Sequence, residues 1–310
     1  MSNQAIENKP LRLPEWLQRD VLLNNKSRNV HSLIQEYSLN TVCQSARCPN
    51  RNECFSSGTA TFMILGNTCT RGCTFCSVPK GKPELPLESN ELKGEPENVA
   101  RAAKILNLKH VVVTSVNRDD LPDQGSMHFV RTIKELRKEI PGITVEVLTP
   151  DFRGDKDCIK NVVDAFPDVY NHNLETVPRL YKEVRPGAIY VRSLELIKYV
   201  KELNSKIITK SGIMLGLGEE KEEIIEVMKD LVNYKCDYLT LGQYMQPNRD
   251  SLSVKRYLHP DEFQELKVIA ENIGFKKVFS GPLVRSSYHA EELHSGVIPM
   301  KMGIQDKSNF

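Results

Sequence analysis

The sequence predicts an α/β fold, a partial, open (β/α)6 barrel of the TIM type with an N-terminal and a C-terminal extension. Two observations lead to this prediction. From about residue 59 onward, runs rich in β-branched residues alternate with segments whose apolar residues recur at helical spacing, which is typical of parallel strands joined by right-handed crossovers. About six such units precede the C-terminal part, too few for a complete eightfold barrel, and 310 residues fit a single barrel of this kind.

Each expected element follows from its local pattern. Residues 110–115 contain a Val-Val-Val-Thr run typical of a buried strand, and residues 260–273 begin with a proline and two acidic residues, which suit a helix N-terminus. By the same patterns, strands are expected at 59–66, 110–115, 143–148, 169–173, 207–217, 238–244 and 275–280. Helices are expected at 95–108, 128–140, 156–166, 191–203, 219–232 and 260–273.

The chain is expected to divide into an N-terminal extension at 1–58, a partial barrel at 59–258 and a C-terminal extension at 259–310. Residues 1–40 are polar with scattered apolar residues such as Leu13 and Trp16, so we expect an arm laid on the core rather than a separate domain. In barrels of this kind the active site lies at the C-terminal ends of the strands. The segment that follows the first strand is therefore expected to carry chemistry.

Composition and charge narrow the class of protein. A net charge of +2 gives no nucleic-acid footprint, and no apolar run approaches the roughly 18 residues that span a bilayer. The N-terminal residues include acidic side chains and no apolar stretch, so they predict neither a secretory signal nor a transit peptide. The eight cysteines are therefore expected to be reduced and available for metal, and the protein is expected to be cytoplasmic.

Six of the eight cysteines form two triplets, and the second triplet is Cys69, Cys73 and Cys76, with C-x3-C-x2-C spacing and Phe75 before the last cysteine. Three thiolates on one tight loop can hold three irons of a [4Fe–4S] cluster and leave the fourth iron open. The alternative is a structural zinc knuckle, but zinc sites usually use C-x2-C pairs closed by a fourth Cys or His, and the first histidine after the loop is His110. The spacing resembles the signature of the radical S-adenosylmethionine (SAM) superfamily, in which the open iron binds SAM.

The resemblance to the radical SAM superfamily implies contacts for SAM at the ends of the strands. Arg118, Asp119, Asn173 and Glu175 are candidates to bind the ribose hydroxyls or the methionyl group. Gly216 lies in the segment 212–219, which resembles the glycine-rich strand that supports adenine in this superfamily. The alternative interpretation is that the polar residues cap helices and pair with one another.

The upstream triplet, Cys43, Cys48 and Cys54, has C-x4-C-x5-C spacing, which matches no common zinc pattern. Together with the sequences VTSVNRDDL at 113–121, HNLETV at 172–177 and GPLVRSSYHA at 281–290, this triplet resembles the lipoyl synthase family. The resemblance runs from roughly residue 30 to residue 290. It implies that the upstream triplet holds an auxiliary [4Fe–4S] cluster.

The same resemblance implies that a serine of the RSSY segment is the fourth ligand of the auxiliary cluster, namely Ser287, with Ser286 as its neighbour. A serine alkoxide is a hard ligand and matches iron less well than thiolate does, which suits a cluster that is dismantled in use. Without the resemblance, this segment would be interpreted as a loop or a helix cap. In one departure, Gln124 stands where the family usually has glycine, which concerns the local turn and no proposed ligand.

The resemblance implies an enzyme, a radical SAM sulfurtransferase that inserts two sulfur atoms, at C6 and C8 of an octanoyl group on a lysine of a lipoyl carrier protein. An unactivated C–H bond resists acid–base catalysis, which calls for a radical. The implied cofactors are two [4Fe–4S] clusters, the auxiliary one being consumed as the sulfur donor, and SAM as cosubstrate. The implied partners are the octanoylated carrier domain, an electron donor and an iron–sulfur carrier that restores the auxiliary cluster; neither nucleic acid nor a membrane is expected.

Two other functions stay open at the level of sequence. One is a different radical SAM sulfur-inserting enzyme, such as a biotin-synthase-like protein, which the upstream triplet and the RSSY segment disfavour. The other is a non-catalytic iron–sulfur carrier, which would not cleave SAM under reducing conditions. The remaining thiols, Cys158 and Cys236, are expected to be buried small hydrophobic residues.

The two extensions are expected to close the open barrel and to help dock the carrier domain. In this hypothesis Trp16 and its apolar neighbours contact the carrier. Arg12 and Arg19 of the arm, and the pair Lys276 and Lys277, are candidates to meet an acidic carrier surface.

Overall fold

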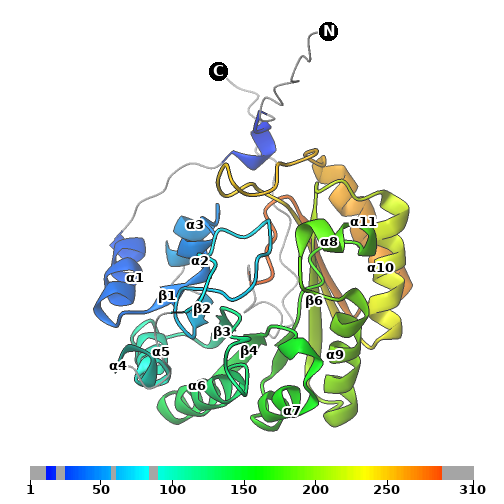
Figure 1. Ribbon diagram of the computed structural model, residues 1–310. Helices are drawn as coiled ribbons and strands as arrows, with labels where there is room; N and C mark the ends of the chain where they lie inside the picture. The colour runs from blue at the N-terminus through cyan, green and yellow to red at the C-terminus, as the bar shows by residue number, and fades with distance from the viewer. Residues whose placement is uncertain (1–11, 19–24, 57–60, 84–89, 288–310) are drawn as a thin grey trace.

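Eight strands form one sheet in the computed structural model, which describes residues 12–18, 25–56, 61–83 and 90–287 (Figure 1). The strands are β1 (Asn40–Thr41), β2 (Thr61–Ile64), β3 (His110–Ser115), β4 (Thr144–Leu148), β5 (Val169–Asn171), β6 (Ile208–Leu215), β7 (Tyr238–Gln243) and β8 (Lys277–Gly281). They lie side by side in the order of the chain, with β1 antiparallel to β2 and all later neighbours parallel. Within the described residues, no pairing joins β8 back to β1 or β2, so the barrel is open.

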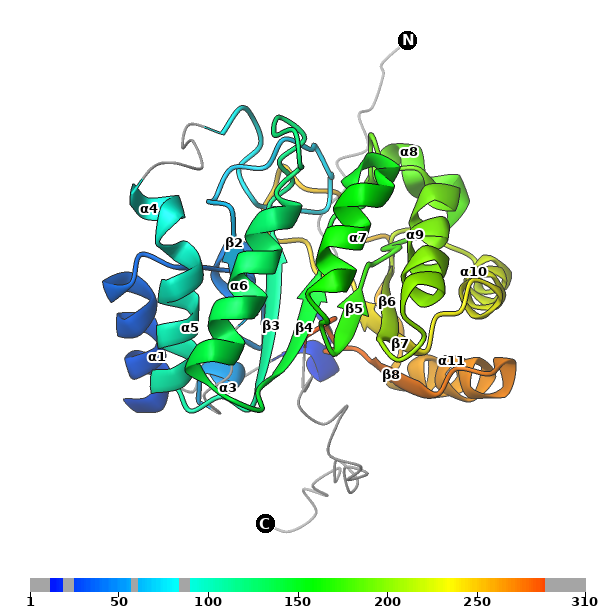
Figure 2. The same ribbon diagram turned by 90° about the horizontal axis from the view of Figure 1, so that it is seen from below.

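Six long helices connect the parallel strands and lie around the outside of the curved sheet (Figures 1 and 2). They are α5 (Glu95–Ile105), α6 (Ser126–Glu139), α7 (Lys156–Asp164), α9 (Tyr190–Leu203), α10 (Lys221–Asn233) and α11 (Pro260–Ile273). Each follows one of the strands β2 to β7, which gives six β/α units and leaves β8 as a seventh parallel strand. The predicted partial (β/α)6 barrel is confirmed.

The local signals that predicted these helices are visible in their ends. The side chain of His259 caps α11 by accepting a hydrogen bond from the backbone of Asp261, and Glu262 accepts one from the backbone N–H of His259 at 2.8 Å. Pro260 occupies the first turn, where its missing N–H has no helical partner to lose. The helix therefore begins where the sequence predicted.

Several helices, most of them short, were not predicted. They are η1 (Glu15–Leu17), α1 (Asn25–Glu36), α2 (Val42–Ser45), α3 (Arg51–Ser56), α4 (Asn90–Lys93), η2 (Phe152–Gly154), η3 (Pro178–Leu180) and α8 (Tyr181–Val184). In Figure 1, α1, α2 and α3 lie beside β1 and β2, so the N-terminal extension covers the first edge of the sheet. At the other edge, β8 extends the sheet by pairing with β7, so the sheet continues beyond residue 258. The helix α11 connects these two strands. The proposed domain boundaries stay a prediction.

A buried ion pair lies in the interior of the barrel, between side chains of β6 and β4. The Nζ of Lys210 lies 3.0 and 3.1 Å from the two carboxylate oxygens of Glu146, and Asn171 donates a third hydrogen bond to that carboxylate at 3.0 Å. Lys210 is 1% exposed and Glu146 is fully buried. Burial alone would raise the pKa of Glu146, but Lys210 and His110 hold it below its ordinary value. The interior below the cavity is therefore polar and charge-paired.

In the part of the chain that the structure describes, no helix is long and apolar enough to cross a membrane.

Candidate active site

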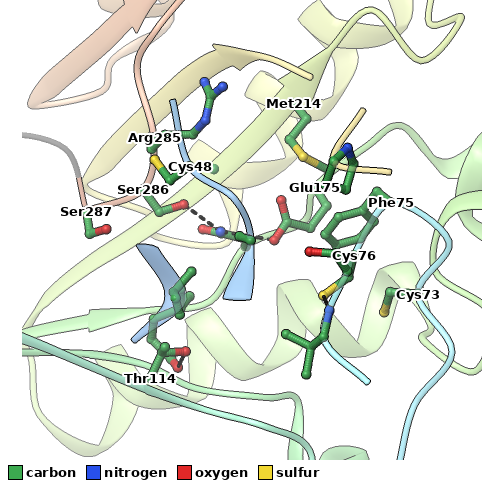
Figure 3. A pocket seen from close by; sticks show the side chains of 18 of the residues that line it. Cys48, Cys73, Phe75, Cys76, Thr114, Glu175, Met214, Arg285, Ser286 and Ser287 are labelled. Atoms are coloured by element: carbon green, nitrogen blue, oxygen red, sulfur yellow. Dashed lines mark hydrogen bonds between the residues drawn. The ribbon is translucent and has the colours of Figure 1, made fainter. Parts of the chain in front are cut away.

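A cavity of about 470 Å³ opens at the C-terminal ends of the parallel strands. Five of the six cysteines of the two triplets line it: Cys43, Cys48, Cys69, Cys73 and Cys76. Figure 3 shows Cys73 and Cys76 on one side of the cavity and Cys48 on the other. The fold thus brings both triplets to one chamber, although they lie on separate segments of the chain.

The loop that carries Cys69, Cys73 and Cys76 follows β2 and is held on both sides by backbone hydrogen bonds. Cys69 donates to the carbonyl of Pro79 at 2.8 Å, and Thr74 donates to the carbonyl of Val184 at 3.0 Å. The sulfur atoms also accept backbone bonds: Asn117 N–H lies 3.4 Å from Cys69 Sγ. Such N–H···S bonds stabilise negative charge on a cluster and raise its reduction potential. The loop is preformed for three thiolate ligands.

Burial sets the protonation of the cysteines in the cavity. It raises the pKa of Cys73, against the opposing effect of the nearby Arg185 guanidinium, and it raises the pKa of Cys76 to about 11. Burial likewise raises the pKa of Cys43 to about 11. These thiols are protonated at neutral pH without metal, so iron binding must release protons.

The upstream triplet lies on α2, α3 and the turn between them. Cys43 is on α2, whose N-cap Thr41 accepts a hydrogen bond from Gln44, and Cys54 is on α3. Cys43 and Cys48 face the cavity, whereas Cys54 is outside its lining. The structure therefore brings two of the three predicted ligands of the auxiliary cluster to the cavity wall.

The C-terminal segment 282–287 passes next to this triplet. Asn50 Nδ2, in the turn between α2 and α3, donates to the carbonyl of Leu283 at 2.6 Å. Ser287 lines the cavity, and its Oγ accepts a hydrogen bond from Thr61 Oγ1 at 2.8 Å. Ser286 also lines the cavity but bonds elsewhere, to Asn173. Tyr288 lies outside the described residues.

A glycine on β7 allows the C-terminal segment to approach the sheet. A Cβ added to Gly242 would lie 2.1 Å from the carbonyl oxygen of Val284, a distance at which the backbone would have to move. Gln243 N–H donates to the carbonyl of Pro282 at 3.3 Å, next to this contact. Only glycine at this position lets Ser286 and Ser287 reach the cavity wall.

The candidate SAM contacts divide into two groups. Asn173 and Glu175 line the cavity, as does Phe75, and Figure 3 shows Glu175 between the two sides. Burial raises the pKa of Glu175. Arg118 and Asp119 do not line the cavity. For Arg118 and Asp119, the sequence also allowed the alternative that they pair with neighbouring side chains.

The two residues outside the cavity have defined partners. Arg118 donates to Asp120 at 2.9 and 3.0 Å. Asp119 accepts two hydrogen bonds from Arg71 of the cysteine loop, at 2.6 and 2.8 Å, and a further nitrogen contact places Arg71 2.8 Å from Asp151. These carboxylates therefore anchor the loop, and a direct contact of Arg118 or Asp119 with SAM stays a prediction that this geometry does not support.

Gly216 also lies outside the cavity lining. Its φ is +99°, and an added Cβ would lie 2.2 Å from Gln243 Nε2 and 2.4 Å from the carbonyl oxygen of Arg256. Gly212, four residues earlier, does line the cavity. An added Cβ there would meet three polar side chains, Thr240, Asn173 and Ser286, at 2.7 to 3.1 Å. The glycine that shapes the cavity is therefore Gly212, at the other end of the segment that the sequence singled out.

The cavity wall has polar atoms without protein partners. Within the described residues, Ser115 Oγ, Thr149 Oγ1, Asn173 Oδ1 and Arg185 Nε are buried and make no hydrogen bond, and all four residues line the cavity. An unsatisfied buried polar atom costs about 1 to 3 kcal/mol. These atoms fit a ligand with several hydrogen-bonding groups, as SAM has.

Sequence reasoning missed Arg185. Its Nη1 donates to the carbonyls of Asn173 and Leu174, at 2.8 and 3.0 Å, and to the hydroxyl of Tyr181 at 3.1 Å. It thereby brings a positive charge to the cavity near Cys73. A single arginine after a short helix has no sequence signal, since its role depends on the strand end that the fold places beside it.

Among the residues that the structure describes, no three His, Cys, Asp or Glu side chains converge closely enough to share one metal ion. A [4Fe–4S] cluster makes no such demand, since each cysteine binds a different iron. The other two cysteines are buried away from the cavity. Cys158 Sγ contacts the carbonyl of Asp123, and Cys236 Sγ that of Tyr238.

The fold and the cysteine loop place the chain in a known class. Residues 63–231 match the Radical SAM superfamily, more than half of the chain, and the chain belongs to this superfamily. Its fold is similar to that of methylornithine synthase, with a TM-score of 0.53 and 15% identity over 83% of this chain and 82% of that one. It is also similar to SuiB of Streptococcus suis bound to S-adenosylmethionine, with a TM-score of 0.55 and 16% identity over 82% of this chain and 60% of that one.

Relatives of much higher identity narrow the class further. The chain is 57% identical over 281 residues to the lipoyl synthase of Caldanaerobacter subterraneus subsp. tengcongensis, covering 91% of this chain and 96% of that protein. It is 54% identical to the lipoyl synthase of Rubrobacter xylanophilus, covering 90% and 85%, and 53% identical to that of Oceanobacillus iheyensis, covering 94% and 91%. The chain belongs to the lipoyl synthase family.

Proposed function

We propose that this chain inserts two sulfur atoms at C6 and C8 of an octanoyl group that is attached to a lysine of a lipoyl carrier protein. The family identifies a radical SAM enzyme that uses SAM and [4Fe–4S] clusters. The observation that carries the residue assignment is the single cavity, which is lined by cysteines of both triplets and by Ser287. A substrate carbon in this cavity can be close to both cofactors at once.

Cys69, Cys73 and Cys76 hold the first cluster, and Cys43, Cys48, Cys54 and Ser287 hold the auxiliary cluster. When bound, the first cluster and SAM supply a radical that can break an unactivated C–H bond, and the auxiliary cluster supplies sulfur. Cys54 lies on α3, in the same short segment as Cys43 and Cys48 but outside the lining of the cavity. Three ligands of this set, Cys43, Cys48 and Ser287, already line the cavity.

The chain's own residues position SAM and keep water out. Asn173 and Glu175 supply polar contacts on the cavity wall. Because Gly212 has no side chain, the amide of Asn173 can occupy the space next to it. Phe75 and Met214 give the same chamber an apolar side (Figure 3). A largely apolar wall suits an octanoyl chain and limits side reactions of a radical.

The partners of this reaction are an octanoylated carrier domain, an electron donor and a protein that restores the auxiliary cluster. Six thiols that serve as iron ligands must stay reduced, which suits the cytoplasm. The proposed carrier contact by Trp16 stays a prediction: its ring lies edge-on to His259 with centroids 5.1 Å apart, and the residue is 39% exposed.

The position of the lysine pair does not support its part in the docking hypothesis. Lys276 and Lys277 lie at the start of β8, whereas the cavity opens at the opposite ends of the strands. Lys276 is also paired with Asp237 at 2.6 Å. A carrier domain docked at the mouth of the cavity would therefore lie at the other end of the strands from these lysines. Arg19 lies outside the described residues.

Product analysis tests the proposed function. The chain is reconstituted with iron and sulfide without oxygen, then incubated with SAM, dithionite and an octanoyl-lysine peptide, and the peptide is weighed by mass spectrometry. We expect a peptide with two added sulfurs and about two molecules of 5′-deoxyadenosine per product. SAM cleavage without sulfur transfer to this peptide would contradict the substrate and favour another sulfur-inserting activity, and no SAM cleavage would favour an iron–sulfur carrier.

A further inference from the structure

One side-chain amide in the cavity wall, that of Asn173, contacts residues of two different segments. Asn173 Nδ2 donates to Ser286 Oγ at 2.6 Å and to Glu175 Oε1 at 3.1 Å. A carboxylate oxygen accepts hydrogen bonds, so the amide nitrogen must face Glu175, and Ser286 is then the acceptor in the other bond. Asn173 therefore links Glu175, a candidate SAM contact, to the segment 282–287, which carries Ser287.

The SAM end of this link is rigid. Glu175 N–H donates to the carbonyl of Gly212 at 2.9 Å, and its own carbonyl accepts from Met214 at 2.9 Å, so its backbone is fixed against β6. Its φ of +67° is unusual for a residue with a side chain. Such strain at a wall residue persists only because the surrounding structure holds it.

The space around the amide is full. A Cβ added to Gly212 would lie 2.7 Å from Thr240 Oγ1, 2.9 Å from Asn173 Oδ1 and 3.1 Å from Ser286 Oγ. Groups packed this closely cannot shift independently, because interiors respond by moving neighbours together. A displacement of Asn173 is therefore passed to Ser286.

The other end of the link is the segment 282–287, which is held by contacts along its length. Ser286 and Ser287 are adjacent, Val284 is seated on Gly242, and Asn50 holds the carbonyl of Leu283. A shift of Ser286 thus carries Ser287 with it. The free Oδ1 of Asn173 gives an incoming polar ligand a direct contact with this chain of groups.

We infer that Ser286 is a positioning residue, which couples SAM binding to the placement of Ser287 at the auxiliary cluster through its hydrogen bond with Asn173. The inference rests on the proposed function, because it takes Ser287 as the cluster ligand. By linkage, SAM then binds with a different affinity when the auxiliary cluster is present, and the cluster is held differently when SAM is present. Removing the Ser286 hydroxyl breaks this coupling while leaving both ligand sets intact.

The test is a double-mutant cycle read by equilibrium binding of SAM without reductant, so that no turnover occurs. Four proteins are compared: the unmodified chain, Cys43→Ala to remove the auxiliary cluster, Ser286→Ala, and both changes together. We expect Cys43→Ala to change the dissociation constant of SAM at least about fivefold when Ser286 is present. In the Ser286→Ala background the same change should have an effect within error of none.

Two further measurements keep the outcomes apart. Ser280→Ala is the matched control, since its Oγ bonds the carbonyl of Phe263 at 2.6 Å outside the cavity lining, and it should leave the coupling intact. Iron analysis of Ser286→Ala should still give two clusters per chain. Equal coupling with and without Ser286, no coupling in the unmodified chain, or loss of one cluster in Ser286→Ala would each overturn the inference. An unmodified chain that binds only one cluster would instead overturn the proposed function.

Discussion

Arg71 lies in the loop that carries Cys69, Cys73 and Cys76, and Arg185 lies close to this loop. The positive charges of the two arginines are compensated differently. Arg71 is held by the carboxylates of Asp119 and Asp151, at 2.6 and 2.8 Å. Arg185 donates to two backbone carbonyls and to the Tyr181 hydroxyl, so in the described part of the chain its hydrogen-bond partners are all neutral. Among the described residues no carboxylate forms a hydrogen bond with Arg185, so its charge beside the site of the first cluster is compensated less directly than that of Arg71.

We predict that Arg185→Gln lowers the reduction potential of the first cluster, because a nearby cation favours the more negative, reduced state. A tenfold change in the ratio of reduced to oxidised cluster corresponds to about 59 mV for one electron, and we expect a shift of at least about this size. A redox titration followed by electron paramagnetic resonance measures it. Arg185→Lys should retain most of the potential.

Lys182→Gln is the control for this prediction. It removes the same charge three residues away, from an exposed side chain, where solvent screens the interaction. An equal shift in Lys182→Gln and Arg185→Gln would show that the potential follows net charge rather than the buried guanidinium.

The cysteines could be predicted from the sequence, and Arg185 could not. Cysteine spacing is a local property here, since the three cysteines of each triplet lie within one short segment. The contacts of Arg185 with Asn173 and Leu174 bring together a helix end and a strand end, and only the fold determines them. Asp119 shows the same limit, because its partner Arg71 lies 48 residues away in the chain.

At the scale of elements, β6 and β7 form a floor on which the C-terminal segment rests. Gly212 and Gly242 are the two positions where a side chain would obstruct it. The long helices and all seven parallel strands could be predicted, because their apolar spacing extends over many residues. The helices α2, α3 and α8 have four to six residues, which is too short for a periodic pattern, and packing rather than propensity stabilises them.

We predict that Gly242→Ala removes the auxiliary cluster and leaves the first one. The new methyl group would displace the backbone of Val284, and with it Ser287, whereas the loop at 69–76 is held by other contacts. Iron per chain should fall by about half, SAM cleavage should persist and sulfur insertion should be lost. Gly142→Ala is the control: Gly142 has open space around it and a φ of +84°, so the change strains the backbone away from the C-terminal segment and should lower stability without removing a cluster. A Gly242→Ala protein that keeps both clusters would contradict the role of this close approach.

At the scale of the whole molecule, the barrel is open, and a buried ion pair fills part of its interior. Lys210 and Glu146 occupy β6 and β4, each two residues before a residue that lines the cavity, so they face the same interior. Removing one partner of such a pair leaves an uncompensated buried charge, which typically costs 3 to 5 kcal/mol.

We predict that Lys210→Met lowers the free energy of unfolding by about 3 to 5 kcal/mol, measured by anaerobic urea denaturation. Combining it with Glu146→Leu should restore most of the loss, because both charges are then gone. Lys198→Met, in an exposed pair with Glu202, should change stability by less than about 1 kcal/mol. A double variant as unstable as Lys210→Met would show that the loss comes from packing rather than charge.

We propose that one cavity holds both cofactors and that the cluster at Cys43, Cys48 and Cys54 gives up its sulfur. The most direct test is reconstitution with sulfide labelled with a heavy sulfur isotope, followed by a single turnover on the octanoyl-lysine peptide in unlabelled buffer and mass spectrometry. We expect both added sulfurs to carry the label. The Cys43→Ala protein should cleave SAM but transfer no sulfur to the peptide. Product with unlabelled sulfur, or labelled product from Cys43→Ala, would contradict this proposal.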